Sequence, residues 1–112
     1  MDKEIQTWLF DILQSIEEVE SYFENNQRVF EIYRNDIKTK RAIERDIEII
    51  GEAVNRILKK DSDFKIENAK QIIGTRNRIA HGYDNISDDF IWSIVINHLP
   101  KLKQEINKLL IS

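Results

Sequence analysis

The sequence predicts an all-α protein, an up-and-down bundle of five to six helices. Apolar residues recur at spacings of three and four along most of the chain, which is typical of helices with one face in a core. Only three Gly and one Pro occur among 112 residues, of which 41% are hydrophobic and 33% charged, and this composition favours helix. No stretch alternates apolar and polar residues as a strand would. Because this length suits a single core, we expect one domain over residues 1–112.

The first predicted helix covers about residues 3–24. Its apolar stripe consists of Ile5, Trp8, Leu9, Ile12, Ile16, Val19 and Phe23. Two asparagines, Asn25 and Asn26, are expected to end it, and a short helical turn is expected at about residues 27–33.

The longest predicted helix covers residues 37–60, with Asp36 as a candidate N-cap. Its main apolar stripe consists of Ile43, Ile47, Ile50, Val54 and Ile57, and a second stripe consists of Ala42, Ile49 and Ala53. Two stripes indicate neighbours on two sides. A glycine inside a helix costs about 1 kcal/mol relative to alanine. We therefore expect another helix to cross closely at Gly51.

The remaining helices are predicted from their end signals. A helix over about residues 66–80 should stop at Gly82 in the left-handed conformation. Ser87 should cap the next helix, with Asp88 and Asp89 in its first turn, where acidic side chains complement the helix dipole. Pro100 cannot continue that helix but suits the first turn of another, so we expect a separate last helix.

Composition limits the classes of function. The chain has no Cys, which excludes disulfides and thiolate metal sites and favours a reducing cytoplasm. No signal peptide is expected from the charged start, and no apolar run approaches the ~20 residues that span a bilayer. The net charge of −3 does not suggest nucleic-acid binding. However, residues 32–112 hold fifteen Lys/Arg against twelve Asp/Glu, so a local basic surface is possible.

The segment Arg76-Asn77-Arg78-Ile79-Ala80-His81-Gly82-Tyr83 carries the most chemical information. A guanidinium can hold the non-bridging oxygens of a phosphodiester, and an imidazole can move the proton, so an arginine beside a histidine can cleave such a bond without a metal. On the residues alone, a structural role is the commoner one: Arg76 and His81 would cap carbonyls and pair with carboxylates.

The spacing RxxxxHxY at the end of a helix resembles the signature of the HEPN superfamily, and Tyr83 resembles that of its HepT branch. The preceding residues 71–75 and the stretch Ile49-Ile50-Gly51-Glu52-Ala53 on the long helix also resemble that branch. The similarity covers about residues 5–105.

This resemblance implies a metal-independent RNA endonuclease that needs no cofactor. It implies a homodimer in which Arg76 and His81 of two protomers form one composite site, with Asn77 as the polar residue that follows the arginine. It also implies that the protein is the toxin of a type VII-like toxin–antitoxin pair. The antitoxin would be an MNT-type nucleotidyltransferase that adenylylates Tyr83.

Other side chains allow both functional and structural interpretations. Arg78 could support RNA binding, although a solvated helix arginine is the commoner role, and Glu52 could orient Arg76 or be purely structural. Four basic residues of the long helix could steer RNA or form an ordinary solvated face: Lys38, Lys40, Arg41 and Arg45. Three further residues are more simply structural than catalytic or base-stacking: His98, Trp8 and Trp92. The competing function is a non-catalytic helical module that binds RNA, a nucleotide or a protein, which the acidic net charge favours.

Overall fold

A computed structural model describes residues 1–24, 28–82 and 86–111. Within those ranges the chain is helical and contains no strand, which confirms the predicted all-α fold. The helices are α1 (Lys3–Ser21), α2 (Phe30–Asn35), α3 (Ile37–Lys60), α4 (Ala69–Ala80), α5 (Asp88–Ser93), a π-helical segment η1 (Ile94–His98) and α6 (Leu99–Ile111).

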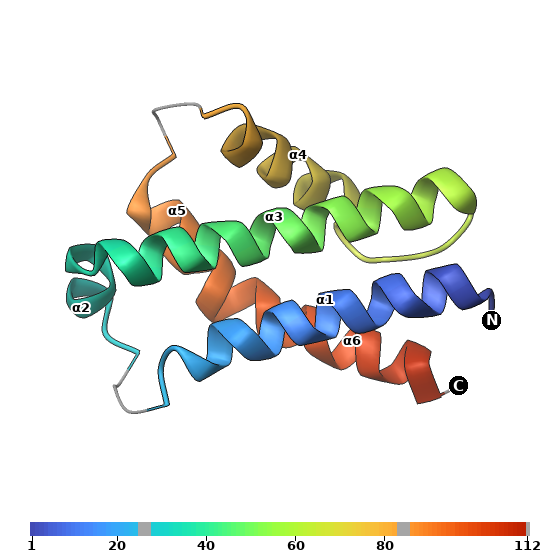
Figure 1. Ribbon diagram of the computed structural model, residues 1–112, viewed down its shortest axis with the longest axis horizontal. Helices are drawn as coiled ribbons and strands as arrows, with labels where there is room; N and C mark the ends of the chain where they lie inside the picture. Colours follow the sequence, from blue (N-terminus) through green and yellow to red (C-terminus); the bar gives the residue numbers. More distant parts are fainter. Residues whose placement is uncertain (25–27, 83–85, 112) are drawn as a thin grey trace.

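The helices form a flat bundle of 41 × 30 × 18 Å (Figure 1). The two longest helices, α1 and α3, run side by side through the middle, and α4 packs along the other side of α3. The short α2 lies at one end of the bundle, and both termini lie at the opposite end (Figure 1). The segment α5–η1–α6 crosses next to α1 and closes the core.

The predicted stripes form this core. Five stripe residues of α1 and five of α3 are almost fully buried: Ile5, Leu9, Ile12, Ile16, Val19, Ile43, Ile47, Ile50, Val54 and Ile57. The predicted caps are also present. Asp36 accepts a hydrogen bond from the Thr39 backbone N–H at 3.1 Å, and Ser87 Oγ accepts one from the Phe90 N–H, also at 3.1 Å.

An aromatic cluster fills the end of the bundle next to α2. Tyr33 is 1% exposed, and its ring centroid lies 5.0 Å from that of Trp92. Phe23 and Phe30 meet the same indole edge-on. Trp92 packs in this cluster, and Trp8 is half-buried against the core, which favours the structural interpretation of both tryptophans.

The expected break before Pro100 is wrong, because α5, η1 and α6 form one continuous helix. Proline lacks an N–H and its ring clashes with the carbonyl four residues back, so an unmodified α-helix cannot easily pass it. Here the backbone widens just before the proline, and the Leu99 N–H donates to the carbonyl of Ile94, five residues back. A π-helical turn of this kind lets the helix continue through Pro100.

Candidate active site

Helix α4 ends as the sequence predicts. His81 is the C-cap residue, and its N–H donates to the Asn77 carbonyl at 3.0 Å. Gly82 follows with a φ of +64°, the left-handed conformation that terminates helices and that glycine adopts without strain. The His81 side chain is exposed, one residue beyond the helix. Tyr83 lies outside the described residues.

The predicted close crossing at Gly51 is confirmed, and the residue that crosses it is Arg76. A Cβ atom placed on Gly51 would lie 2.2 Å from Arg76 Cβ and 3.1 Å from the Ile72 carbonyl oxygen. Only a glycine leaves room for α4 at this point. The aliphatic part of the Arg76 side chain therefore lies directly on the backbone of α3.

Several polar groups surround the guanidinium of Arg76. Its Nη1 donates to Asn77 Oδ1 at 3.0 Å, and its Nη2 lies 3.9 Å from Glu52 Oε2 on α3. Its Nε is buried and has no hydrogen-bond partner in the described structure. The side chain as a whole is 32% exposed. The guanidinium is thus fixed at its base and open to solvent at its end, as an anion-binding group must be.

The structure brings Arg76, Asn77 and Glu52 together but directs Arg78 elsewhere. The Arg78 guanidinium carbon lies 5.1 Å from the centre of the Phe90 ring, a cation–π contact with α5. Both groups line a groove of about 830 Å³ beside α4. His98 also lines this groove, whereas Arg76 and His81 are not among its described lining residues. The Arg76 and Arg78 side chains therefore lie on different sides of α4.

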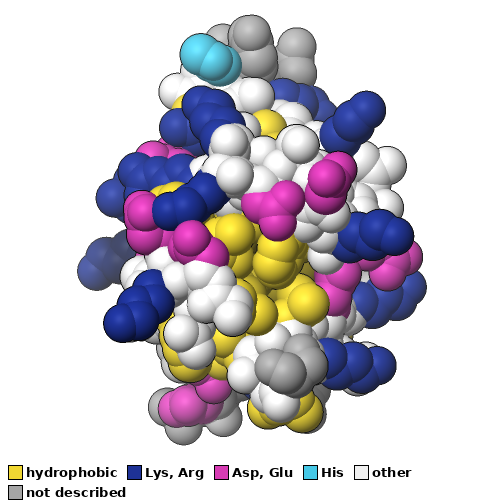
Figure 2. Space-filling view, turned by 90° about the vertical axis from the view of Figure 1, so that its right-hand side faces the viewer, with side chains coloured by type: hydrophobic (Ala, Val, Ile, Leu, Met, Phe, Trp, Pro, Cys, Tyr) yellow, Lys and Arg dark blue, Asp and Glu magenta, His cyan; other side chains and the backbone are white. Residues whose placement is uncertain are grey.

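Hydrophobic side chains form much of the floor of this groove, among them Ile47, Ile50, Ile72 and Leu102. On the face drawn in Figure 2, hydrophobic side chains form a continuous exposed area bordered by charged ones. The protein thus presents apolar surface that its own chain does not cover.

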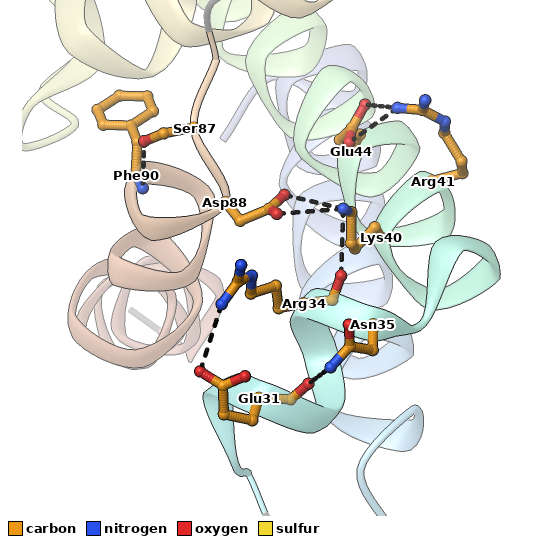
Figure 3. Close-up of polar contacts among 9 residues, drawn as sticks. All are labelled: Glu31, Arg34, Asn35, Lys40, Arg41, Glu44, Ser87, Asp88 and Phe90. Carbon is orange, nitrogen blue, oxygen red and sulfur yellow. Dashed lines mark hydrogen bonds and ion pairs between the residues drawn. The ribbon is translucent and has the colours of Figure 1, made fainter.

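Two members of the basic patch of α3 are neutralised by carboxylates (Figure 3). Lys40 Nζ lies 3.1 Å from Asp88 at the start of α5, and Arg41 pairs with Glu44 at 3.2 Å. Lys40 therefore connects α3 to α5. For these two residues the structure favours the interpretation of an ordinary charged surface over RNA steering.

Sequence reasoning missed a buried carboxyl at Asp46, which is 2% exposed. The Tyr22 hydroxyl donates to its Oδ2 at 2.8 Å. Burial, followed by the nearby Glu18 carboxylate, raises the pKa of Asp46 to about 7. Its place three residues after Ile43 on the apolar stripe is the signal that could have revealed it.

Two features are absent from residues 1–24, 28–82 and 86–111. No group of three or more His, Asp and Glu side chains is arranged to hold a metal ion there. No helix in the same ranges is long and apolar enough to cross a membrane.

Comparison with known proteins identifies the class to which this fold and site belong. The model of the HepT-like ribonuclease family matches residues 12–109. The chain therefore belongs to the HepT-like ribonuclease family, and it is a ribonuclease.

Individual relatives agree with this assignment. A protein of Methanocaldococcus jannaschii named "putative RNase" is 32% identical over 96% of this chain and 88% of its own length. A second protein of that organism with the same type of name is 31% identical over 93% of this chain and 94% of its own length. The "probable ribonuclease HepT" of Thermococcus cleftensis is 30% identical over 97% of this chain and 98% of its own length. No solved structure matches the chain.

Proposed function

We propose that the protein is a metal-independent RNA endonuclease whose active site combines Arg76 and His81 of two protomers. The observation that carries this proposal is the placement of Arg76. Its stem is fixed against Gly51, its guanidinium is held by Asn77 and Glu52, and the exposed His81 follows at the end of the same helix.

The reaction would be an internal transfer within RNA. One His81 takes the proton from a ribose 2′-hydroxyl, and the 2′-oxygen forms a bond to the adjacent phosphorus while the bond from phosphorus to the 5′-oxygen breaks. The second His81 or a water returns a proton to the leaving 5′-oxygen. Arg76 stabilises the negative charge on the pentacoordinate phosphorus. The products are a 2′,3′-cyclic phosphate and a 5′-hydroxyl, and DNA, which lacks the 2′-hydroxyl, is not cleaved.

A homodimer supplies what one protomer lacks. Each protomer offers one Arg76 and one His81, whereas an efficient reaction needs both a general base and a general acid. A two-fold axis that brings the two His81 residues to one cleft provides two imidazoles.

The proposed control of the enzyme involves Tyr83. As the toxin of a type VII-like toxin–antitoxin pair in the cytoplasm, the protein would be silenced when an MNT-type nucleotidyltransferase transfers AMP from ATP to the Tyr83 hydroxyl and releases pyrophosphate. The added phosphodiester would compete with the RNA phosphate for Arg76. Mass spectrometry after incubation with that enzyme and ATP should detect AMP on Tyr83, together with lost cleavage. Equal silencing of Tyr83→Phe would exclude this mechanism.

The two histidines of the chain provide a matched test of the mechanism. His81→Ala should slow RNA cleavage by roughly 10²–10⁴-fold, the usual contribution of a general acid–base group. His98→Gln changes the other exposed imidazole, which lines the groove and does not lie beside Arg76, and should leave kcat within a few-fold of the wild type. Wild-type cleavage should persist in EDTA. Full activity of His81→Ala would remove His81 from the mechanism, and a wild-type protein that binds RNA without cutting it would instead favour a binding module.

A further inference from the structure

Two residues of α3 extend the site around Arg76 beyond the motif. Glu52 follows Gly51 directly, and Arg56 lies one helical turn further on the same face. We propose that Arg56 is a second phosphate-binding residue, which contacts an RNA phosphate adjacent to the one held by Arg76, and that Glu52 positions both guanidinium groups. This inference rests on the proposed function.

The geometry is that of one carboxylate between two arginines. Glu52 Oε1 accepts from Arg56 Nη2 at 2.7 Å, whereas Glu52 Oε2 lies 3.9 Å from Arg76 Nη2. Each guanidinium therefore approaches a different oxygen of the same carboxylate. The two guanidinium groups therefore lie on either side of one carboxylate and come from two adjacent helices.

The exposure of the three side chains suits an anion-binding surface. Arg56 is 54% exposed, Glu52 45% and Arg76 32%. Two positive charges against one negative leave the group with a net charge of +1. Each guanidinium has five N–H donors, of which Glu52 occupies at most two. On Arg76, Asn77 takes one more and the Nε–H is buried, so donors still remain for a ligand on both arginines.

The presence of two neighbouring guanidinium groups indicates the chemistry of the ligand. Two guanidinium groups held side by side match a chain with a repeated anion, and an RNA backbone has one phosphate per nucleotide. Phosphate contacts fix the register of a nucleic acid on a protein without reading its sequence. Arg56 would thus hold the strand in place while Arg76 acts on the phosphate that is cleaved. In this role Arg56 and Glu52 are positioning residues, and Glu52 keeps both guanidinium groups oriented before RNA arrives.

The matched control is Arg34. It is 56% exposed and pairs with Glu31 three residues earlier at 3.6 Å, on α2 rather than beside Arg76 (Figure 3). Arg34→Gln and Arg56→Gln therefore each remove one exposed, carboxylate-paired arginine with the same change in net charge. Circular dichroism should show that both variants remain folded.

The first measurement is binding of a single-stranded RNA oligonucleotide between 50 and 200 mM NaCl, in the non-cleaving His81→Ala background. Each phosphate contact to a single strand contributes roughly −0.7 to the slope of log K against log salt. Arg56→Gln should flatten the slope by about 0.7 relative to Arg34→Gln. Arg56→Lys, which keeps the charge, should recover most of the slope.

The second measurement is cleavage by otherwise wild-type protein. Arg56→Gln should raise KM by about tenfold with little change in kcat, the loss expected for one charge-assisted hydrogen bond to substrate. Glu52→Gln should lower kcat as well, because it releases Arg76. Equal salt slopes and equal KM values for Arg56→Gln and Arg34→Gln, in a protein that cleaves RNA, would overturn the inference and leave the proposed function intact. If the wild type did not cleave RNA, the proposed function would fail, and the salt slopes would still decide whether Arg56 binds phosphate.

Discussion

Helix α3 makes two contacts of opposite character. Towards α1 it presents buried isoleucines and valine, and six residues of α1 are buried as well. Towards α4 it presents Gly51, and in α4 only Thr75 is buried. The first contact buries apolar side chains, which is the main driving force of folding. The second holds Arg76. The face of α3 towards α1 therefore contributes to stability, and the face towards α4 positions a candidate site residue.

The α3–α4 contact contains features that a contact built only for stability would avoid. Gly51 lowers the helix propensity of α3, and the buried Nε of Arg76 has no hydrogen-bond partner in the described structure. Both features disfavour folding, since an unsatisfied buried donor costs about 1–3 kcal/mol. Gly51 and the buried Nε are explained if this contact serves to hold the Arg76 guanidinium in one position. The α1–α3 contact can offset this cost.

Truncating the core on the α1 side should have the largest effect on stability. Ile12 is fully buried, so Ile12→Ala should lower the free energy of unfolding by about 2–5 kcal/mol. Ile72 on α4 is only half-buried, so Ile72→Ala should cost clearly less. Urea titrations of the two variants test this comparison. Equal losses in the free energy of unfolding would show that the α1 and α4 sides of α3 contribute equally to stability.

The same α1–α3 contact should make stability depend on pH. The pKa of Asp46 is raised to about 7, so between about pH 4 and 7 the folded protein keeps a proton that the unfolded chain has lost. Stability should therefore fall as pH rises through this window, by at most about 1.4 kcal/mol per pH unit, and level off above it. Thermal unfolding of Asp46→Asn should show a flatter profile. A wild-type stability that rises from pH 4 to 7 would contradict this assignment.

The α4 side can be tested with two glycines of opposite surroundings. Gly51→Ala should destabilise the protein by about 1–3 kcal/mol, because its Cβ would overlap Arg76 Cβ and push α4 away. Cleavage should fall with it, since Arg76 moves. Gly74→Ala in α4 is the control. A Cβ there meets nothing within 4 Å, so the variant should gain up to about 1 kcal/mol. If Gly51→Ala were as stable and active as Gly74→Ala, the close crossing would have no role.

Sequence patterns predicted those parts of the molecule that depend on local rules. Helix periodicity, the caps at Asp36 and Ser87, and the stop at Gly82 all follow from neighbouring residues. The close crossing at Gly51 was also predictable, but the residue that crosses it was not, because that requires the packing of two distant segments. The π-helical turn before Pro100 was missed for a related reason: proline favours a break, and the packing of α6 favours a continuous helix.

The sequence also predicted only part of the candidate site. The motif identified Arg76, Asn77 and His81, and the structure brings the first two together. Arg56 lies twenty residues before Arg76 in a different helix, and no local pattern links the two. The side of α4 on which each arginine lies also depends on the helices packed against α4.

Arg78 distinguishes the two sides of α4. Its guanidinium lies over the Phe90 ring, so Arg78→Gln should lower stability by about 0.5–1 kcal/mol, the range for an exposed cation–π contact. A double-mutant cycle with Phe90→Leu should recover this value as a coupling energy. Because Arg78 lines the groove and not the Arg76 side, cleavage should fall only a few-fold through weaker RNA binding. Arg76→Gln should reduce it far more. If the two arginine variants lost activity equally, Arg76 and Arg78 would belong to one RNA-binding surface and would not act on separate sides of α4.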